Sequence, residues 1–174
     1  GSNLKSLTKV ILSAAPKESL MSFCFGGTGG VLIYGRPESD NNEPCIGRIH
    51  EASPNHYQRE IYRLETSFPT YFAYGSQKIA WSKEIPEKVY FLGAVAQSKQ
   101  DKDVLYQYTF FVIELDDNTH TAKVLSKIPL GKENIKKPTP PLELIVLDSQ
   151  TVYLQMPIEI TMIDVSKDAQ PRIL

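Results

Sequence analysis

The sequence has little of what usually marks a secreted or disulfide-built protein. It carries only two cysteines among 174 residues, Cys24 and Cys45, and buried thiols explain them better than a disulfide framework does. No Asn-x-Ser/Thr glycosylation acceptor occurs anywhere in the chain. Both shortages favour an intracellular, cytoplasmic location or a bacterial source.

The sequence also lacks an excess of charge of either sign and any long apolar run. Nineteen basic and twenty acidic residues leave a net charge of −1. This balance provides no electrostatic footprint for nucleic acid or for an anionic membrane surface. No apolar stretch approaches the roughly 18–20 residues that span a bilayer. We therefore expect no nucleic-acid partner and no membrane association.

Motifs that carry chemistry are missing as well. The glycine-rich stretch 26–30 has no Gly-Lys-Ser/Thr ending and runs into a strand-like segment, so a hairpin turn explains it better than a phosphate cradle. Cys45, His50 and His56 are spaced too widely for a zinc frame. No Gly-x-Ser-x-Gly elbow occurs. The sequence predicts no catalytic, cofactor-binding or metal-binding residue and no cofactor, and it favours a protein that is not an enzyme.

What the sequence does contain is a series of short β-favouring runs separated by turn residues. Strands are expected at 8–12, 20–25, 31–34, 45–50, 89–95, 105–115, 122–125 and 161–165. Residues 53–65 fit two interpretations equally. Ser53-Pro54 could begin a helix in which Tyr57, Ile61 and Leu64 share one face, or the segment could be an outer strand.

Two pairs of segments resemble each other, in the same order along the chain. Residues 72–82 and 145–155 both run from an apolar stretch through Ser-Gln into a second apolar stretch. The segment that begins at Val112 and the one that begins at Thr161 share an apolar-acidic-turn pattern. These similarities predict a single all-β domain over 1–174 with repeat units at 20–65, 70–127 and 142–174.

The expected fold is all-β, built from repeated antiparallel hairpin units and β-propeller-like. Three units are fewer than the roughly four to eight blades that close a propeller, so the ring would be partial or assembled from several chains. The alternative is a β-sandwich or barrel with one short helix near 54–65.

Aromatic residues supply the candidate interaction surface. Alternate residues of a strand face opposite sides, so some tyrosines in the aromatic runs are expected to face solvent, where interfaces use them. The candidates are Tyr71, Tyr74, Trp81, Tyr106 and Tyr108. We expect a non-catalytic scaffold that binds a protein partner or associates with itself. The alternatives are a fragment of a propeller-type hydrolase or lyase, and a glycan-binding module that uses Trp81.

Overall fold

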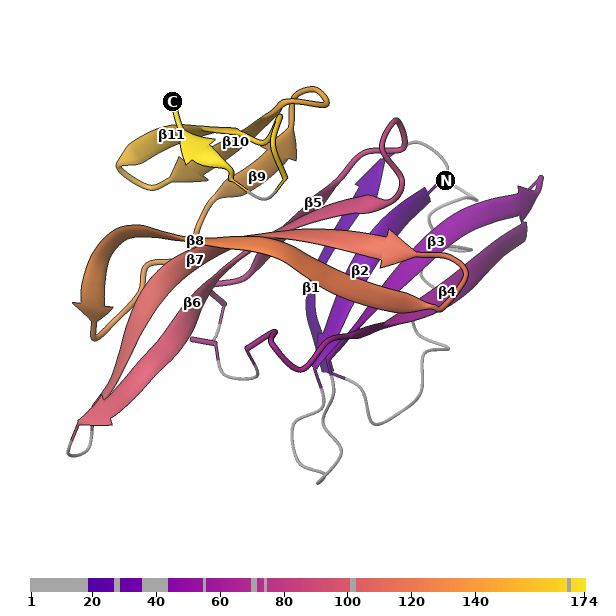
Figure 1. Cartoon of the computed structure of the whole chain (residues 1–174). Coiled ribbons are helices and arrows are strands. Elements are labelled where there is room, and N and C mark those ends of the chain that lie inside the picture. Colours follow the sequence, from indigo (N-terminus) through magenta and orange to yellow (C-terminus); the bar gives the residue numbers. More distant parts are fainter. Residues whose placement is uncertain are drawn as a thin grey trace.

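β-strands are the only regular secondary structure in the part of the chain that the structure describes (Figure 1). The computed structural model describes residues 19–26, 29–35, 44–54, 56–69, 72–73, 75–100, 103–168 and 170–174. The strands are β1 (Ser19–Gly26), β2 (Gly29–Gly35), β3 (Cys45–Ser53), β4 (His56–Leu64), β5 (Lys78–Trp81), β6 (Lys88–Gln100), β7 (Asp103–Asp116), β8 (Thr121–Ile135), β9 (Glu143–Val146), β10 (Thr151–Met156), β11 (Glu159–Asp164) and β12 (Arg172–Ile173). The predicted all-β class is confirmed. The predicted strand at 8–12 lies outside the described residues.

Eight strands form one strongly curved sheet in the order β1-β2-β3-β4-β8-β7-β6-β5. Two antiparallel meanders, β1–β4 and β5–β8, meet where β4 runs parallel to β8. At the other end of the sheet β5 lies against β1 and β2, and the Cys24 thiol donates a hydrogen bond to the Trp81 carbonyl. The sheet is therefore barrel-like and nearly closed, which agrees with the barrel alternative.

The concave side of this sheet holds the first hydrophobic core. Phe68, Phe72, Phe91 and Phe111 pack there with ring centroids 5.2–6.0 Å apart. Alternation along β6 and β7 sends Phe91 and Phe111 inward and their neighbours outward. Gly93 is required beside this cluster, because a Cβ there would lie 2.6 Å from the Phe72 ring.

The remaining strands form a second, smaller sheet in the order β12-β11-β10-β9. It lies across β6, β7 and β8 (Figure 1), and a second core fills the space between the two sheets. Tyr90 and Phe110 stack on the barrel side of this core. Val152 and Ile163 are fully buried on the other side. Strands β6 and β7 are therefore covered on both faces.

Residues 53–65 form a strand and not a helix, so the helix expected near 54–65 is wrong. β4 pairs antiparallel with β3 along its length, and Pro54 lies in the turn between them. Tyr62 and Leu64 face the core while Ile61 faces out, a period of two. The pairing with β3, which a helix could not provide, decides between the two local patterns.

The similarity between 72–82 and 145–155 is not a structural repeat. Residues 145–155 form the hairpin β9–β10. In contrast, Phe72 and β5 both pair with β6, as one interrupted strand. The interruption is closed by Ser76, whose buried hydroxyl donates to the Ala73 carbonyl at 2.7 Å and accepts from the Ala94 amide at 3.1 Å.

The other similarity is local. Glu114 pairs with Lys123 across β7–β8, and Asp164 pairs with Arg172 across β11–β12, but the two strand pairs belong to different sheets. Of the expected units, 142–174 coincides with the smaller sheet, whereas 20–65 and 70–127 together build the larger one. The strands of the described residues show no propeller blades.

Candidate functional site

The outer face of the smaller sheet, turned away from the barrel-like sheet, is the most unusual surface among the described residues. The apolar side chains on or beside it are the exposed Ile145, Leu147, Ile160, Met162 and Leu174 and the half-buried Tyr153. We call this set the outer face. Because alternate residues face opposite sides, the inward members of the same strands, such as Leu144, Leu154 and Ile163, are already used in the core.

Strand register places these apolar side chains next to one another. Tyr153 of β10 lies opposite Ile145 of β9 on one side and Met162 of β11 on the other. The Leu174 amide donates to the Met162 carbonyl at 2.9 Å, which extends the row towards β12. Laterally adjacent residues on one face of a sheet lie about 5 Å apart, so the row is continuous.

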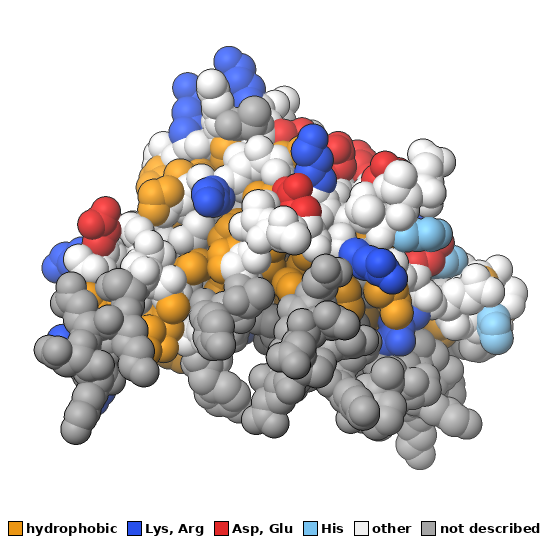
Figure 2. All heavy atoms as spheres, turned by 60° about the horizontal axis from the view of Figure 1, so that its bottom comes forward, with side chains coloured by type: hydrophobic (Ala, Val, Ile, Leu, Met, Phe, Trp, Pro, Cys, Tyr) orange, Lys and Arg blue, Asp and Glu red, His pale blue; other side chains and the backbone are white. Residues whose placement is uncertain are grey.

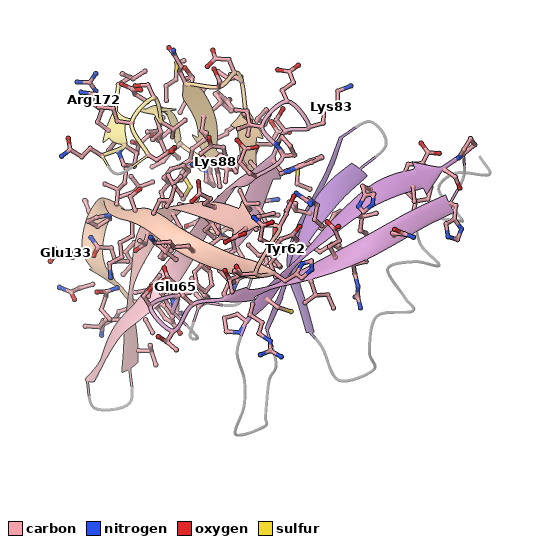
Figure 3. All side chains as sticks on the ribbon, turned by 45° about the vertical axis from the view of Figure 1, so that its right-hand side comes forward. Tyr62, Glu65, Lys83, Lys88, Glu133 and Arg172 are labelled. Carbon is pink, nitrogen blue, oxygen red and sulfur yellow. The ribbon has the colours of Figure 1, made fainter. Side chains whose placement is uncertain are left out.

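Polar groups border this row. On one side Arg172 donates to Asp164 at 2.9 Å, and Figure 3 shows Arg172 at the edge of the sheet, away from the barrel-like sheet. Hydrogen bonds from Ser166, followed by the bond from Arg172, lower the pKa of Asp164 to about 2. On the other side lie Glu143 and Gln155, which are cross-strand neighbours. An apolar centre with a polar rim is the anatomy of a protein interface.

A second candidate is a cluster of charged and aromatic groups at the junction of the two meanders. The Tyr62 hydroxyl oxygen lies 2.9 Å from Glu60 and 2.8 Å from Asp117, so its single hydrogen is shared between the two carboxylates. Arg48 forms ion pairs with the same two carboxylates at 2.6 and 2.9 Å, and its guanidinium lies over the Tyr62 ring. His50 lies 4.0 Å from Glu60.

The electrostatics of this cluster are those of a structural network. Burial, and then the hydrogen bonds to Asp117 and Glu60, raise the pKa of Tyr62, which keeps its hydroxyl protonated. Burial opposes ionisation of Glu60, but the hydrogen bonds from Arg48 and Tyr62 outweigh it and lower the pKa. The two carboxylates, Glu60 and Asp117, are thus each paired with both Tyr62 and Arg48. The network reinforces the short parallel pairing between β4 and β8, which has two residue pairs and is extended by hydrogen bonds of Glu65 with Ala122 and Val124.

A third charged group joins the two sheets. The Lys88 ammonium lies 2.6 Å from Asp168 and 3.2 Å from Glu114. Figure 3 shows Lys88 between the smaller sheet and the barrel-like sheet. Burial alone would lower the pKa of Lys88, but the two carboxylates outweigh it and raise the pKa. Lys88 therefore acts as a charged tie between layers.

The structure places three of the five aromatic candidates, while Tyr71 and Tyr74 lie outside the described residues. Trp81 is half-buried where β5 meets β1 and β2: its indole N–H donates to the Pro86 carbonyl at 3.1 Å and its ring lies against Gly29. Tyr106 packs against the core between the sheets. Tyr108 is only 8% exposed, and its hydroxyl donates to the Thr139 carbonyl. They do not form one surface, and their role in binding stays a prediction.

The sequence signal of the outer face is a strand with apolar residues at consecutive positions, in place of strict alternation. Residues 144–147 are Leu-Ile-Val-Leu and residues 160–163 are Ile-Thr-Met-Ile. Apolar residues on both sides of a strand indicate a sheet whose two faces are both packed against other groups. That signal was present in the sequence.

Chemistry-bearing groups elsewhere do not assemble into a reactive centre within the described ranges. No group of three or more metal-ligating side chains is found there. On the face in Figure 2, acidic and basic side chains of the described residues are interspersed, not gathered by sign. Cys24 and Cys45 are half-buried and are not joined by a disulfide.

The fold and this surface define an all-β protein with a barrel-like sheet and an apolar second sheet. Searches with protein-family models and among curated proteins found no match for this sequence. Within the described residues, no helix is long and apolar enough to cross a membrane.

Proposed function

We propose that this protein is a non-catalytic protein-interaction module that associates through the outer face, and that its partner is a second copy of the chain. The observation that carries the proposal is the continuous row Ile145–Tyr153–Met162–Leu174. Exposed contiguous apolar patches on folded proteins mark interaction sites, whereas single exposed apolar residues are ordinary.

Self-association fits the chemistry of this face. Two such faces packed about 10 Å apart would form a sandwich with a third apolar layer, a common arrangement of sheets. The rim carries the exposed cation Arg172 on the β12 side of the row and the anion Glu143 on the β9 side, so a two-fold-related copy can place opposite charges against each other. The net charge of −1 adds little repulsion between copies.

Light scattering with size exclusion tests the proposal, and the chain offers a matched pair of variants. Ile145 on the outer face is 41% exposed, and Ile61 on β4 of the other sheet is 40% exposed. We expect Ile145→Lys to weaken dimerisation by about thirtyfold, the loss typical of an interface hot spot. Ile61→Lys should leave the dimer unchanged.

A monomer at concentrations well above the micromolar range would contradict self-association, as would equal weakening by the two variants. No arrangement among the described residues favours the hydrolase, lyase or glycan-binding alternatives over this proposal.

A further inference from the structure

A cavity of about 550 Å³ lies where the two sheets diverge, on the opposite side of the smaller sheet from the outer face. Leu92 and Leu130 line it from the barrel-like sheet, and Leu154, Met156 and Thr161 line it from β10 and β11. This volume is within the roughly 300–1,000 Å³ of small-molecule sites, and its apolar lining is typical of them.

An unusual bulge in β8 forms one wall of the cavity. Tyr108 pairs with Leu130 and Tyr106 pairs with Ile135, so one residue of β7 faces four residues of β8, 131–134. Gly131 and Asn134 take positive φ values of 65° and 59° there. Glycine and asparagine are the residues that adopt left-handed backbone most readily, so both positions suit the bulge. Bulges are over-represented at barrel rims and beside functional sites. The bulge turns β8 away from the smaller sheet and opens the cavity.

The opposite rim is apolar where a turn is normally polar. The β10–β11 hairpin turns at Pro157-Ile158, and both residues line the cavity. Ile158 is 98% exposed. Tips of hairpins usually carry Gly, Asn, Asp or Ser. A fully exposed isoleucine at a cavity mouth is explained if an apolar molecule covers it.

The charges at the mouth are predominantly positive. Lys132 from the bulge and Lys137 from the following segment both line the cavity and are exposed, against the single carboxylate of Glu159. Glu133, the bulge's own carboxylate, does not line the cavity (Figure 3 shows it on the bend of β8). Lysine stems pack on apolar surface while their ammonium groups stay in water, which suits the rim of an apolar cavity.

We propose that this cavity binds a small amphipathic acid, with its apolar body among Leu130, Leu154 and Met156 and its carboxylate at the mouth between Lys132 and Lys137. The site is independent of the outer face, because the two lie on opposite sides of β10 and β11.

Methionine methyl NMR tests the proposal with an internal control. The chain has three methionines: Met156 lines the cavity, Met162 lies on the outer face, and Met21 lies in β1. With ¹³C-methyl methionine and decanoate below its micellar concentration, we expect the Met156 resonance to shift and the Met162 resonance to stay. Met156→Leu assigns the signal.

The outcomes separate the two proposals. No Met156 shift, or a shift of Met162 alone, overturns the cavity assignment. If diluting the protein shifts the Met162 resonance but not the Met156 resonance, the shift reports self-association through the outer face. If dilution leaves the Met162 resonance unchanged, only the proposed function is contradicted and the cavity proposal stands.

The anionic headgroup is tested with a cation of the same tail and with a charge-reversal pair. Decyltrimethylammonium should bind at least several-fold more weakly than decanoate. Lys132→Glu should weaken decanoate by about fivefold, the size of an exposed charge interaction, while Lys127→Glu, exposed on the same strand but outside the cavity, should not. Equal binding of both amphiphiles, or equal effects of both variants, overturns the carboxylate assignment.

Discussion

The two sheets differ in how many of their large apolar side chains are exposed to solvent. In the barrel-like sheet, large apolar residues are almost all enclosed: among the described residues, only Phe23 and Ile61 are exposed there. The other exposed large apolar residues all fall within 142–174. Alternation along the strands is the same in both sheets, but the smaller sheet has apolar residues at inward and outward positions. The comparison shows that the burial of an apolar side chain depends on what covers its face of the sheet, and not on the alternation pattern alone.

The largest expected loss of stability is in the hydrophobic core on the concave side of the barrel-like sheet. Phe91→Ala removes a ring that contacts Phe68, Phe72 and Phe111, and the strands around it are too constrained to collapse. We expect the free energy of unfolding to fall by about 3–5 kcal/mol, measured by urea denaturation. A loss below about 1 kcal/mol would mean that the barrel interior is loosely packed.

A pair of adjacent residues on β11 examines the smaller sheet directly. Ile163 is fully buried in the core between the sheets, and Met162 beside it is exposed on the outer face. We expect Ile163→Ala to cost about 2–4 kcal/mol. Met162→Ala should change the stability of the monomer by less than about 0.5 kcal/mol. Similar losses at the two positions, measured in dilute solution, would contradict the described facing of β11.

A smaller effect is expected at the charged tie between the sheets. Lys88→Met removes the cation that joins Glu114 and Asp168 but keeps the length of the side chain. The carboxylates remain partly solvated, so we expect a loss of about 1 kcal/mol, measured by urea denaturation. If Lys88 joins the two sheets only through its charge, high salt should reduce the difference in unfolding free energy between the wild type and the variant.

The smallest expected effect is on the stability of the protein at low pH. The pKa of Asp164 falls from 3.8 to about 2 on folding, so this carboxylate contributes stability that is present above pH 4 and is lost as the pH falls towards 2. Asp164→Asn should flatten the stability profile in that window. Arg172→Gln, which keeps the Ser166 bonds, should flatten it only in part. If both variants lose stability with falling pH as steeply as the wild type, Asp164 does not contribute to the acid dependence of stability.

The sequence predicted the strand content well, because periodicity is a local signal. The runs at 45–50, 89–95 and 105–115 all lie within observed strands. It did not predict the parallel pairing of β4 with β8, which joins residues far apart in the chain. The resemblance of 72–82 to 145–155 misled because Ser76 is buried in a strand interruption, whereas Ser149 lies in an exposed turn.

The exposure of the aromatic candidates was harder to predict, because it also depends on contacts between distant segments. Tyr106 and Tyr108 were expected at an exposed edge because alternate strand residues usually face solvent on one side. Both faces of β7 are covered, one by the barrel interior and the other by the smaller sheet. Apolar residues on both sides of β7 indicate that both faces are covered, but the local pattern does not encode which distant segment covers each face.

The narrow junction between β4 and β8 has a kinetic consequence. Each meander can form from neighbouring hairpins, whereas the junction joins Arg63 to Thr121 and closes a long loop. Contacts of high sequence separation tend to form late in folding. We therefore expect the bond of the Tyr62 hydroxyl to Asp117, which lies 55 residues away in the chain, to be absent from the folding transition state. Tyr62→Phe should accelerate unfolding and leave the folding rate almost unchanged, so the junction sets how long the folded molecule survives.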